Sequence, residues 1–596
     1  MHSLTKTWCL ALGHALLMPL GVDGQMFVEG DAQGTLVTNH VGGFLGQGVS
    51  FMDFNGDDLD DLTFTQFEGE LFAYVNNGQG GFTPQDLGIG EVLEQPKSAL
   101  WVDLDNDGDK DLLVTQRLAP NVLFARMPDG NLQVVPNAGG LALGSGERTY
   151  GAAVADYDRD DLLDVYLCHY HSPQSNSEEN ALLRNLGGTD LSMAFEDVTA
   201  MSGTGNGVQQ SFQATWVDLD RDGWLDLHVI NDRLHWPDVL FRNQGDGTFT
   251  EVGTAWGLDV SAYSMSTSVA DFDKDQDWDI VSTNGSDAGN HFRKCSGQPF
   301  GPFGTDETSS LWYQEVASEA GILMDNLAWG GVWFDADNNG WLDLYIGTGT
   351  SLYTDYPAVV DLYPDSDNGL YMNADGSLPL TDVSQEVNPF NELTFSVATA
   401  DHNGDGALDL VSHQIGLRAH LLNGVPNGNH WIAVRPLADS GCPDAIGAEL
   451  TCWKEGLGDV RTVHCGTEYM NQNSAWIHFG LGSEPSYDSI VVAWPSGATT
   501  THVGLDVDQR HVLSEVLDEV GTETLGCTYP MACNFEAAAT TDDGSCDMSC
   551  ACGLGTAWDS SLQMCVVDCI GDFTGDGAVG SSDLIVFLTL FGAVCD

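Results

Sequence analysis

The sequence predicts an all-β protein in which a seven-bladed β-propeller is followed by a small β domain and a disulfide-rich tail. Three observations support this prediction. A nine-residue acidic pattern recurs seven times, short β-prone runs flank each copy, and eight of the fourteen cysteines fall between Cys527 and Cys595. Self-similarity at a nearly regular period is typical of repeat folds such as propellers.

The repeated pattern reads D-x-[DN]-x-[DN]-x-x-x-D followed by an aliphatic residue, at intervals of 50 to 66 residues. Its copies begin at Asp53, Asp103, Asp156, Asp218, Asp271, Asp335 and Asp401. A β-prone run precedes each copy and a second starts at its aliphatic residue, so each copy is expected to be the turn of a hairpin. A third and a fourth β-prone run often follow in the same repeat, as at 240–243 and 249–252. Four strands in a repeat of this length make one propeller blade.

The seventh repeat is one strand short before the next domain begins. We therefore expect a strand between Gln25 and about Thr38 to close the ring from the N-terminus. Closure leaves only short sheet edges. The predicted domains are a propeller at 25–425, a small β domain at 426–517, a Cys-rich linker module at 518–570 and a calcium loop with a helix at 571–596.

Each acidic loop has the residue types that bind calcium. Side chains at positions 1, 3, 5 and 9 and the carbonyl at position 7 offer the hard oxygen ligands that Ca²⁺ prefers, and Mg²⁺ fits less well. No Cys or His pattern favours zinc in these loops. The predicted ligands are Asp53, Asn55, Asp57, Leu59, Asp61, Asp103, Asp105, Asp107, Asp109, Asp111, Asp156, Asp158, Asp160, Leu162, Asp164, Asp218, Asp220, Asp222, Trp224, Asp226, Asp271, Asp273, Asp275, Asp277, Asp279, Asp335, Asp337, Asn339, Trp341, Asp343, Asp401, Asn403, Asp405, Ala407 and Asp409.

Position 6 of each loop needs a left-handed backbone, which glycine adopts without strain. Four loops have glycine there and three have Asp58, Asp161 or Gln276. Asp tolerates this conformation better than Gln. The fifth loop, with Gln276, is therefore expected to be the weakest calcium site.

These loops resemble the FG-GAP/VCBS repeats of integrin α-subunit heads and of many secreted bacterial proteins, over roughly residues 25–425. The resemblance implies a seven-bladed propeller, similar to the N-terminal region of integrin α, with calcium at the hairpin turns. Stretches 429–434, 446–448, 478–482 and 494–497 resemble the ASPIC/UnbV domain. A propeller followed by this domain is the layout of the cartilage acidic protein family.

The tail resembles two kinds of module. The stretch from Cys527 to Cys546 is similar to Cys-rich repeats of exported bacterial proteins, and disulfides are favoured over zinc because no histidine lies there. Residues 572–583 fit an EF-hand-type loop and resemble one half of a dockerin. Its predicted calcium ligands are Asp572, Thr574, Asp576, Ala578 and Asp583. In the small β domain, the symmetric placement of Cys452 and Cys465 about a turn at Gly458 predicts a cross-strand disulfide.

The net charge limits the partners expected for this chain, and the N-terminal residues indicate its location. A net charge of -69 excludes nucleic acid and anionic membrane surfaces as main partners. Residues 1–24 resemble a signal peptide, with Lys6 before a short apolar run, and no later run is long enough to span a membrane. The chain is therefore expected to be secreted or held at the cell surface.

The leading functional hypothesis is a calcium-dependent, non-catalytic protein that mediates adhesion or binds an extracellular protein or glycan. Nearly every conspicuous carboxylate has a metal role, and no HExxH, GxSxG or phosphate-binding glycine loop occurs. Trp224 and Trp341, both at position 7, are expected to pack between blades. A secreted polysaccharide lyase or hydrolase with its site in the propeller channel is the alternative. A surface-assembly component anchored through its tail is a third possibility.

Overall fold

The computed structural model describes residues 25–515 except 32, 41–44, 68, 90–92, 143–147, 172–178, 286–288, 296–311, 325, 350–366, 388–393, 415 and 439–441, together with a few short strands beyond 515. Those strands are β39 (Leu525–Gly526), β40 (Thr541–Asp542), β41 (Thr556–Asp559) and β42 (Met564–Val567). The predicted signal peptide and the EF-hand-like loop lie outside the described residues. The chain divides into a compact unit of residues 1–515 and a second unit of residues 516–596.

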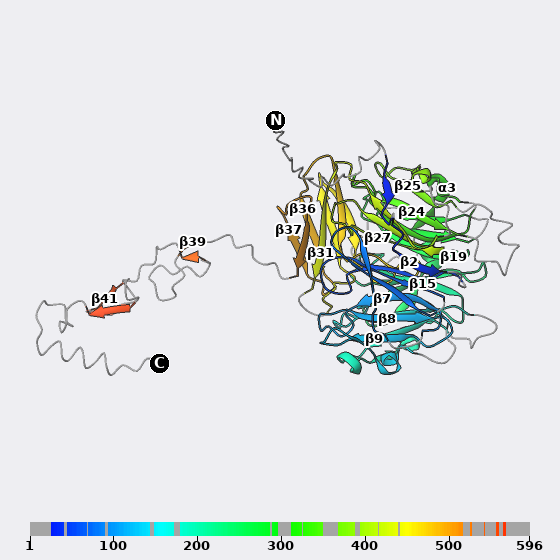
Figure 1. Ribbon diagram of the computed structural model, residues 1–596, viewed down its shortest axis with the longest axis horizontal. Helices are drawn as coiled ribbons and strands as arrows, with labels where there is room; N and C mark the ends of the chain where they lie inside the picture. Colours follow the sequence, from blue (N-terminus) through cyan, green and yellow to red (C-terminus); the bar gives the residue numbers. More distant parts are fainter. Residues whose placement is uncertain are drawn as a thin grey trace, which may run out of the picture. The chain divides into compact units, whose positions relative to one another are not determined.

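The larger unit is all-β and is dominated by four-stranded, β-propeller-like sheets (Figure 1). Its first four repeats form β3 (Val49–Met52), β4 (Asp61–Thr65), β5 (Leu71–Asn76), β6 (Phe82–Gln85), β7 (Pro96–Val102), β8 (Asp111–Gln116), β9 (Val122–Arg126), β10 (Leu132–Val134), β11 (Thr149–Ala155), β12 (Asp164–His169), β13 (Ala181–Asn185), β14 (Phe195–Asp197), β15 (Ser211–Val217), β16 (Asp226–Asn231), β17 (Val239–Asn243) and β18 (Phe249–Glu251). The next three form β19 (Ser264–Ala270), β20 (Asp279–Asn284), β21 (His291–Cys295), β22 (Tyr313–Glu315), β23 (Ala328–Phe334), β24 (Asp343–Thr348), β25 (Gly369–Met372), β26 (Thr381–Asp382), β27 (Thr394–Ala400), β28 (Asp409–Gln414) and β30 (His420–Gly424). The acidic loops join the first two strands of each sheet, as predicted.

The first strand of each sheet is buried along nearly its whole length and packs against the first strand of the next sheet. This succession runs β3, β7, β11, β15, β19, β23 and β27, and β27 then contacts β3.

Short helices follow the fourth strands of three sheets, and 3-10 turns occur elsewhere. They are α1 (Thr199–Ser202), α2 (Gly253–Trp256), α3 (Ala317–Ala320), η1 (Pro136–Gly140), η2 (Asp190–Ser192) and η4 (Ser384–Glu386). In the part of the chain that the structure describes, no helix is long and apolar enough to cross a membrane.

An N-terminal strand completes the sheet of the seventh repeat, which confirms the predicted contribution from residues 25–38. Strand β1 (Phe27–Glu29) pairs antiparallel with β30, so that Phe27 lies opposite Gly424. Strand β2 (Val37–His40) pairs with β29 (Gly416–Arg418). Phe27 is 2% exposed and Leu36 is fully buried, so both side chains belong to the core.

Deleting residues 25–40 should therefore lower the melting temperature by several degrees or more. The loss of one buried aromatic side chain such as Phe27 costs about 3–5 kcal/mol. Differential scanning calorimetry would measure the shift, with a chain that begins at Gln25 as the control. Identical melting curves for the two chains would show that β1 does not support the seventh sheet.

The remaining strands of this unit form two further sheets. One contains β31 (His430–Leu437), β35 (Ile477–Gly482) and β38 (Arg510–Ser514), and the other contains β32 (Glu449–Lys454), β33 (Leu457–Thr462), β36 (Ser489–Ala493) and β37 (Thr499–His502). We refer to residues 430–515 as the C-terminal β region. It shares one apolar cluster with the second, third and fourth repeats, which joins Ile432 and Leu450 to Leu100, Val154 and Ala214. Figure 1 shows β31, β36 and β37 beside these sheets.

Residues 463–474, which we call the inserted segment, leave the C-terminal β region and enter the ring of first strands. Its strand β34 (Asn471–Gln472) pairs parallel with β3. The Val154 N–H of β11 donates to the Cys465 carbonyl at 3.0 Å, and the Gln472 side chain bonds both the N–H and the carbonyl of Trp101 in β7. On the other side, Asn471 donates to the Val397 carbonyl of β27 at 2.6 Å.

The predicted disulfide between Cys452 and Cys465 is wrong, because both are buried free thiols. The hairpin of β32 and β33 turns at Glu455–Gly456 rather than at Gly458, and Cys452 therefore lies opposite Asp459. Cys465 follows the end of β33 and bridges to Val154 instead. Symmetric sequence spacing misplaced the turn by about three residues. The cysteine side chains of the tail lie outside the described residues.

Candidate metal centre

The aspartate at position 9 fixes each acidic loop to its sheet. One carboxylate oxygen accepts the backbone N–H of a residue on the third strand, and in most loops the other accepts the N–H of position 2. For the fourth loop, Asn243 and Leu219 donate to Asp226 at 2.9 and 3.2 Å. The donors to the seven aspartates, on the third strand or directly after it, are Asn76, Arg126, Asn185, Asn243, Cys295, Asn373 and Gly424. These bonds hold position 9 close to position 1 without any ion.

Two left-handed residues shape every loop. Position 6 has a φ between 66° and 96° in all seven, which confirms the predicted conformation, and Gln276 adopts it with a φ of 69°. Position 4 is also left-handed, from Arg221 at 54° to Gly56 at 78°, which sequence reasoning missed. The position-6 N–H then donates to the position-1 carboxylate, at 2.9 Å from Gly108 to Asp103 and at 3.0 Å from Gln276 to Asp271.

Five of the loops bring three carboxylates to one point. In each, one oxygen from every member lies within 4.8 Å of the others. The groups are Asp103, Asp105 and Asp107; Asp156, Asp158 and Asp164; Asp218, Asp220 and Asp226; Asp271, Asp273 and Asp279; and Asp335, Asp337 and Asp343. Such a set of converging hard oxygens suits a calcium ion.

The first and seventh loops have asparagine at position 3, where the other five have aspartate. Asn55 donates to the position-9 Asp61 at 3.0 Å, which brings these two ligand positions together. In the seventh loop the Asn403 carbonyl accepts the N–H of Asp405 at 2.9 Å. The side-chain carbonyl of asparagine is an ordinary calcium ligand. These two loops have the same framework, and like the sixth loop, with Asn339 at position 5, they have three carboxylates at positions 1, 3, 5 and 9 instead of four.

The fifth loop contains carboxylate oxygens that have no hydrogen-bond donor. Asp271 Oδ1, Asp273 Oδ1 and Asp279 Oδ2 are buried and lack a hydrogen-bond partner, and all three residues belong to the group in the fifth loop. An unpaired buried oxygen is costly, and a bound cation satisfies it. The fifth loop, expected from Gln276 to be the weakest site, therefore has the donor set that most needs an ion.

Three loops also face a basic residue on the third strand. Arg242 contacts Asp220 at 2.5 Å and Asp222 at 3.0 Å, and Arg184 contacts Asp158 and Asp160 at 2.7 Å each. Lys294 pairs with Asp273 in the fifth loop. Each cation neutralises part of the charge at ligand positions 3 and 5, so it opposes binding of a metal ion there.

The crowded aspartates hold protons at higher pH than usual. Burial, together with Asp444 and Asp105, raises the pKa of Asp103 to about 7. Burial and the Glu449 carboxylate raise the pKa of Asp218 to about 8. At position 9, burial raises the pKa well above the usual value for Asp164, Asp226, Asp279, Asp343 and Asp409.

The metal-free protein should therefore become less stable as the pH rises. Asp103 and Asp218 keep protons in the folded state up to about pH 7–8, whereas the unfolded chain loses them near pH 4. The folded state binds more protons in this window, so the free energy of unfolding decreases with pH. Melting curves in EDTA between about pH 5 and pH 8 would measure the decrease, and calcium should flatten it because the ion displaces the protons. A rise of the melting temperature with pH in EDTA would contradict this.

Position 4 of one loop reaches the next loop around the ring. Asn106 donates to the Asp161 carbonyl at 2.8 Å, and Asn338 donates to the Gly406 carbonyl at 2.7 Å. Arg159 lies 4.4 Å from the ring centre of Trp224, and Lys274 lies 4.6 Å from that of Trp341. The two position-7 tryptophans thus pack against the preceding loop, as predicted, and neighbouring loops support one another.

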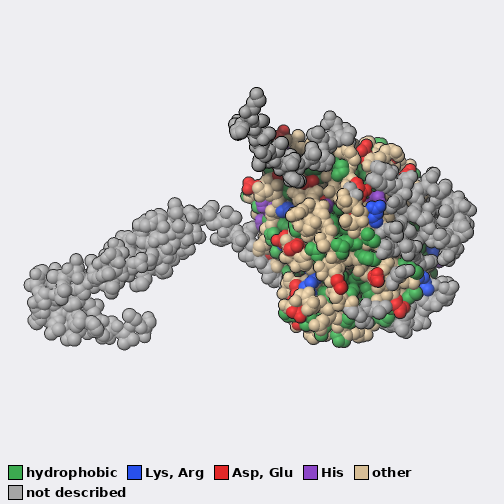
Figure 2. Space-filling view, in the orientation of Figure 1, with side chains coloured by type: hydrophobic (Ala, Val, Ile, Leu, Met, Phe, Trp, Pro, Cys, Tyr) green, Lys and Arg blue, Asp and Glu red, His purple; other side chains and the backbone are tan. Residues whose placement is uncertain are grey.

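The C-terminal β region contacts the same loops. Its polar links include Arg435 to Asp58 at 2.7 Å, Asp444 to the Asp103 N–H at 3.2 Å, Glu449 to Arg221 at 3.0 Å, Asp459 to Lys274 at 3.4 Å, His478 to Asn338 at 2.8 Å and Arg510 to Asp401 at 3.5 Å. The third and fourth loops border a cavity of about 400 Å³ with Trp494 of this region. The loops are therefore both candidate metal sites and a docking face for the C-terminal β region. Figure 2 shows acidic side chains scattered over one face of the described residues.

Comparison with known proteins identifies the repeats and the domain that follows them. A family model described as FG-GAP-like repeat matches residues 53–114, 103–167 and 218–282, and a model described as ASPIC and UnbV matches residues 439–519. Each FG-GAP match begins at position 1 of an acidic loop.

Cartilage acidic protein 1 of Mus musculus and that of Homo sapiens are each 25% identical over 332 residues, or 53% of this chain. The match covers 47% and 46% of the relatives, so the chain spans about half of their length. Among solved structures, BBS1N in complex with ARL6DN, soaked with lead, is 10% identical with a TM-score of 0.40, covering 68% of this chain and 98% of that one. Saccharomyces cerevisiae Sqt1 is 8% identical with a TM-score of 0.38, covering 68% and 99%. The chain therefore contains FG-GAP-like repeats and an ASPIC/UnbV domain and is homologous to cartilage acidic protein 1.

Proposed function

We propose that this chain is a secreted, calcium-binding and non-catalytic protein that binds an extracellular protein or glycan. In this proposal the seven sheets are the blades of one propeller, and each acidic loop holds a calcium ion. Residues 572–583 hold a further ion, and the tail offers a possible attachment to a surface assembly. The convergence of buried carboxylate oxygens that lack a donor is the observation that carries the proposal.

The ions have a structural role in this proposal. When bound, calcium supplies positive charge that offsets repulsion between carboxylates of one loop. Two like charges about 4 Å apart cost on the order of 1–4 kcal/mol in surroundings between water and the protein surface. Positions 1, 3, 5 and 9 would hold the ion with their side chains. The loops would then present a fixed face to the C-terminal β region.

The inserted segment opposes the alternative of a polysaccharide lyase or hydrolase that works in the channel. Tyr469 is fully buried, and its ring centre lies 5.5 Å from those of Phe212 and Trp329, on the fourth and sixth sheets. Its hydroxyl donates to the Leu45 carbonyl beside β3 at 2.6 Å. A side chain that touches several sides of the ring fills the space a polysaccharide would need. We therefore favour a binding surface outside the channel axis.

Metal analysis of the purified protein tests the calcium proposal. We expect seven ions in a chain truncated after residue 515, and one fewer in a D279N variant because position 9 of the fifth loop loses its charge. The matched control is D129N, which changes an exposed aspartate in another hairpin turn. A folded protein that contains essentially no metal would overturn the proposal.

Glycan arrays with and without EDTA, together with a reducing-sugar assay, separate the two functional classes. The proposal predicts calcium-dependent binding without turnover. Release of new reducing ends from any polysaccharide would favour the enzymatic alternative. Sequencing the N-terminus of the exported protein would test whether the chain is cleaved after Gly24.

A further inference from the structure

Four of the acidic loops have the same ligand carboxylates but differ at one residue of the third strand. The second, third, fourth and fifth loops have aspartate at all of positions 1, 3, 5 and 9. The residue that differs precedes the backbone donor to position 9, and it has the same register in each of the four sheets. In chain order this residue is Ala125, Arg184, Arg242 and Lys294. The chain therefore contains the same set of carboxylates with and without a neighbouring cation.

Each of the two arginines bridges positions 3 and 5 of its loop. In the fourth loop, Arg242 Nε donates to Asp220 Oδ2 at 2.5 Å, and Nη2 donates to Asp222 Oδ2 at 3.0 Å. Arg184 contacts positions 3 and 5 of the third loop at 2.7 Å each. A guanidinium group keeps its positive charge and offers two fixed donors to carboxylates. Each arginine therefore occupies oxygens of two side chains that the proposed calcium ion also needs.

Position 5 lies differently in the loops with and without a basic neighbour. In the second loop, Asp107 at position 5 converges with positions 1 and 3. In the third, fourth and fifth loops, the converging groups found among the described residues contain positions 1, 3 and 9 instead. This difference is the one expected if a cation on the third strand holds the position-5 carboxylate. The basic residue thus goes together with a different arrangement of the ligand set.

The fifth loop has a weaker form of the same contact. Lys294 pairs with Asp273 at position 3, and Asp273 Oδ1 has no hydrogen-bond partner. A lysine ammonium is a compact charge without the two-pronged geometry of arginine. An ion in this loop would gain an unpaired oxygen and would compete with a less well-fitted cation. We therefore expect the lysine to oppose calcium less than the two arginines do.

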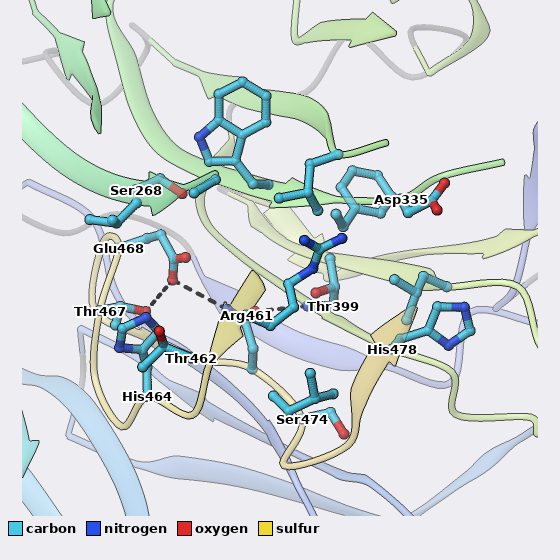
Figure 3. A pocket seen from close by; sticks show the side chains of 18 of the residues that line it. Ser268, Asp335, Thr399, Arg461, Thr462, His464, Thr467, Glu468, Ser474 and His478 are labelled. Atoms are coloured by element: carbon cyan, nitrogen blue, oxygen red, sulfur yellow. Dashed lines mark hydrogen bonds between the residues drawn. The ribbon is translucent and has the colours of Figure 1, made fainter. Parts of the chain in front are cut away.

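The other three loops have no charged residue at the equivalent third-strand position, which holds Val75, Met372 and Asn423. Near the sixth loop, Figure 3 shows Arg461 and Asp335, which is position 1, in the lining of one cavity. The Arg461 guanidinium lies apart from that carboxyl in the figure and donates to Asp459 at 3.1 Å. In the seventh loop, Arg510 makes a longer contact of 3.5 Å with Asp401. Neither arginine bridges two ligand positions as Arg184 and Arg242 do.

We propose that Arg184 and Arg242 divide the calcium sites into two classes, so that the third and fourth loops bind calcium about ten- to a hundredfold more weakly than the second loop. The inference rests on the calcium binding proposed above and adds its regulation. An ion must displace the guanidinium from positions 3 and 5 or lie beside its positive charge. The two loops are neighbours and border the cavity with Trp494. Calcium at a level between the two classes would leave this one arc unfilled.

Metal analysis at buffered free calcium would test the proposal. The full chain is dialysed against a series of chelator-buffered calcium concentrations, and the bound ions per chain are counted. At a concentration that fills only the tighter class, R184M/R242M should hold two more ions than the unaltered protein, and each single variant should hold one more. At saturating calcium all counts should be equal. R293M is the matched control, because Arg293 also lies on a third strand but pairs with Glu315, which is not a predicted ligand.

M372R makes the opposite change. Met372 is half-buried on the third strand of the sixth sheet, and an arginine there would face Asp337 at position 3. We expect this variant to hold one ion fewer than the unaltered protein at the intermediate concentration.

The failures of the two proposals differ. A protein without calcium at saturation overturns the calcium proposal itself. A calcium-loaded protein whose ion count is the same in R184M/R242M, R293M and the unaltered chain at every concentration overturns this inference alone. If the double variant does not fold, M372R decides, and an unchanged ion count in it would overturn the inference.

Discussion

Removal of calcium with EDTA should lower the melting temperature by about 10–20 °C. At free calcium about 100 times the dissociation constant, each site contributes about 2.7 kcal/mol of stability, or close to 19 kcal/mol for seven sites. A folded unit of this length has an unfolding entropy near 1 kcal/mol per kelvin, which converts that free energy into a shift of this size. Differential scanning calorimetry before and after chelation would measure it.

Chelation of calcium should also weaken the contact between the C-terminal β region and the acidic loops. Asp58, Asp103 and Asp401 belong to acidic loops and bond Arg435, Asp444 and Arg510 of that region. Once the loops lose their ions, repulsion between their carboxylates shifts these docking groups. Proteolysis near residues 425–429, where the chain passes from β30 to β31, should accelerate in EDTA. Returning calcium should restore both readouts, and returning magnesium should restore them less because it demands a stricter geometry.

An R435M/R510M variant separates docking from metal binding. It removes two polar links to the loops and leaves every predicted ligand in place. We expect it to keep its full calcium content while proteolysis near residues 425–429 becomes faster in calcium. A melting curve that does not change in EDTA would mean that the loops are acidic turns without a metal role.

The acidic loops could be predicted from the sequence because each is local. All of its groups lie within nine residues, so the spacing alone places Asp103, Asp105 and Asp107 near one point. The left-handed position 6 followed from the same local geometry. The strand at Phe27 was predictable as well, since the seventh repeat lacked a partner for β30. Counting strands in a repeat is sufficient for that inference.

The inserted segment could not be predicted in this way. Gln472 bonds Ser50 across 422 residues of sequence, and it bonds Trp101 across 371. Nothing in residues 463–474 marks them as a segment that enters a ring of strands. Position 4 was missed because Arg221, Lys274 and Asn338 are ordinary surface residues by type. Their positive φ angles become visible only in three dimensions.

Replacing residues 467–473 with a glycine–serine linker should destabilise the larger unit by on the order of 10 kcal/mol. Loss of the fully buried Tyr469 side chain costs about 3–5 kcal/mol by comparison with other large-to-small changes. Loss of Gln472 and Asn471 leaves backbone groups of Trp101 and Val397 without partners, at about 1–3 kcal/mol each. The melting temperature in calcium should therefore fall by about 10 °C.

Two further variants test whether the effect comes from the ring rather than from the linker. The same replacement at residues 483–486, which are exposed, should shift the melting temperature by a degree or two at most. Y469F removes only the hydroxyl that bonds Leu45 and should cost about 1 kcal/mol. Equal stability of the 467–473 and 483–486 replacements would mean that the inserted segment does not tie the sheets together. The C-terminal β region would then be an appendage to the ring of sheets.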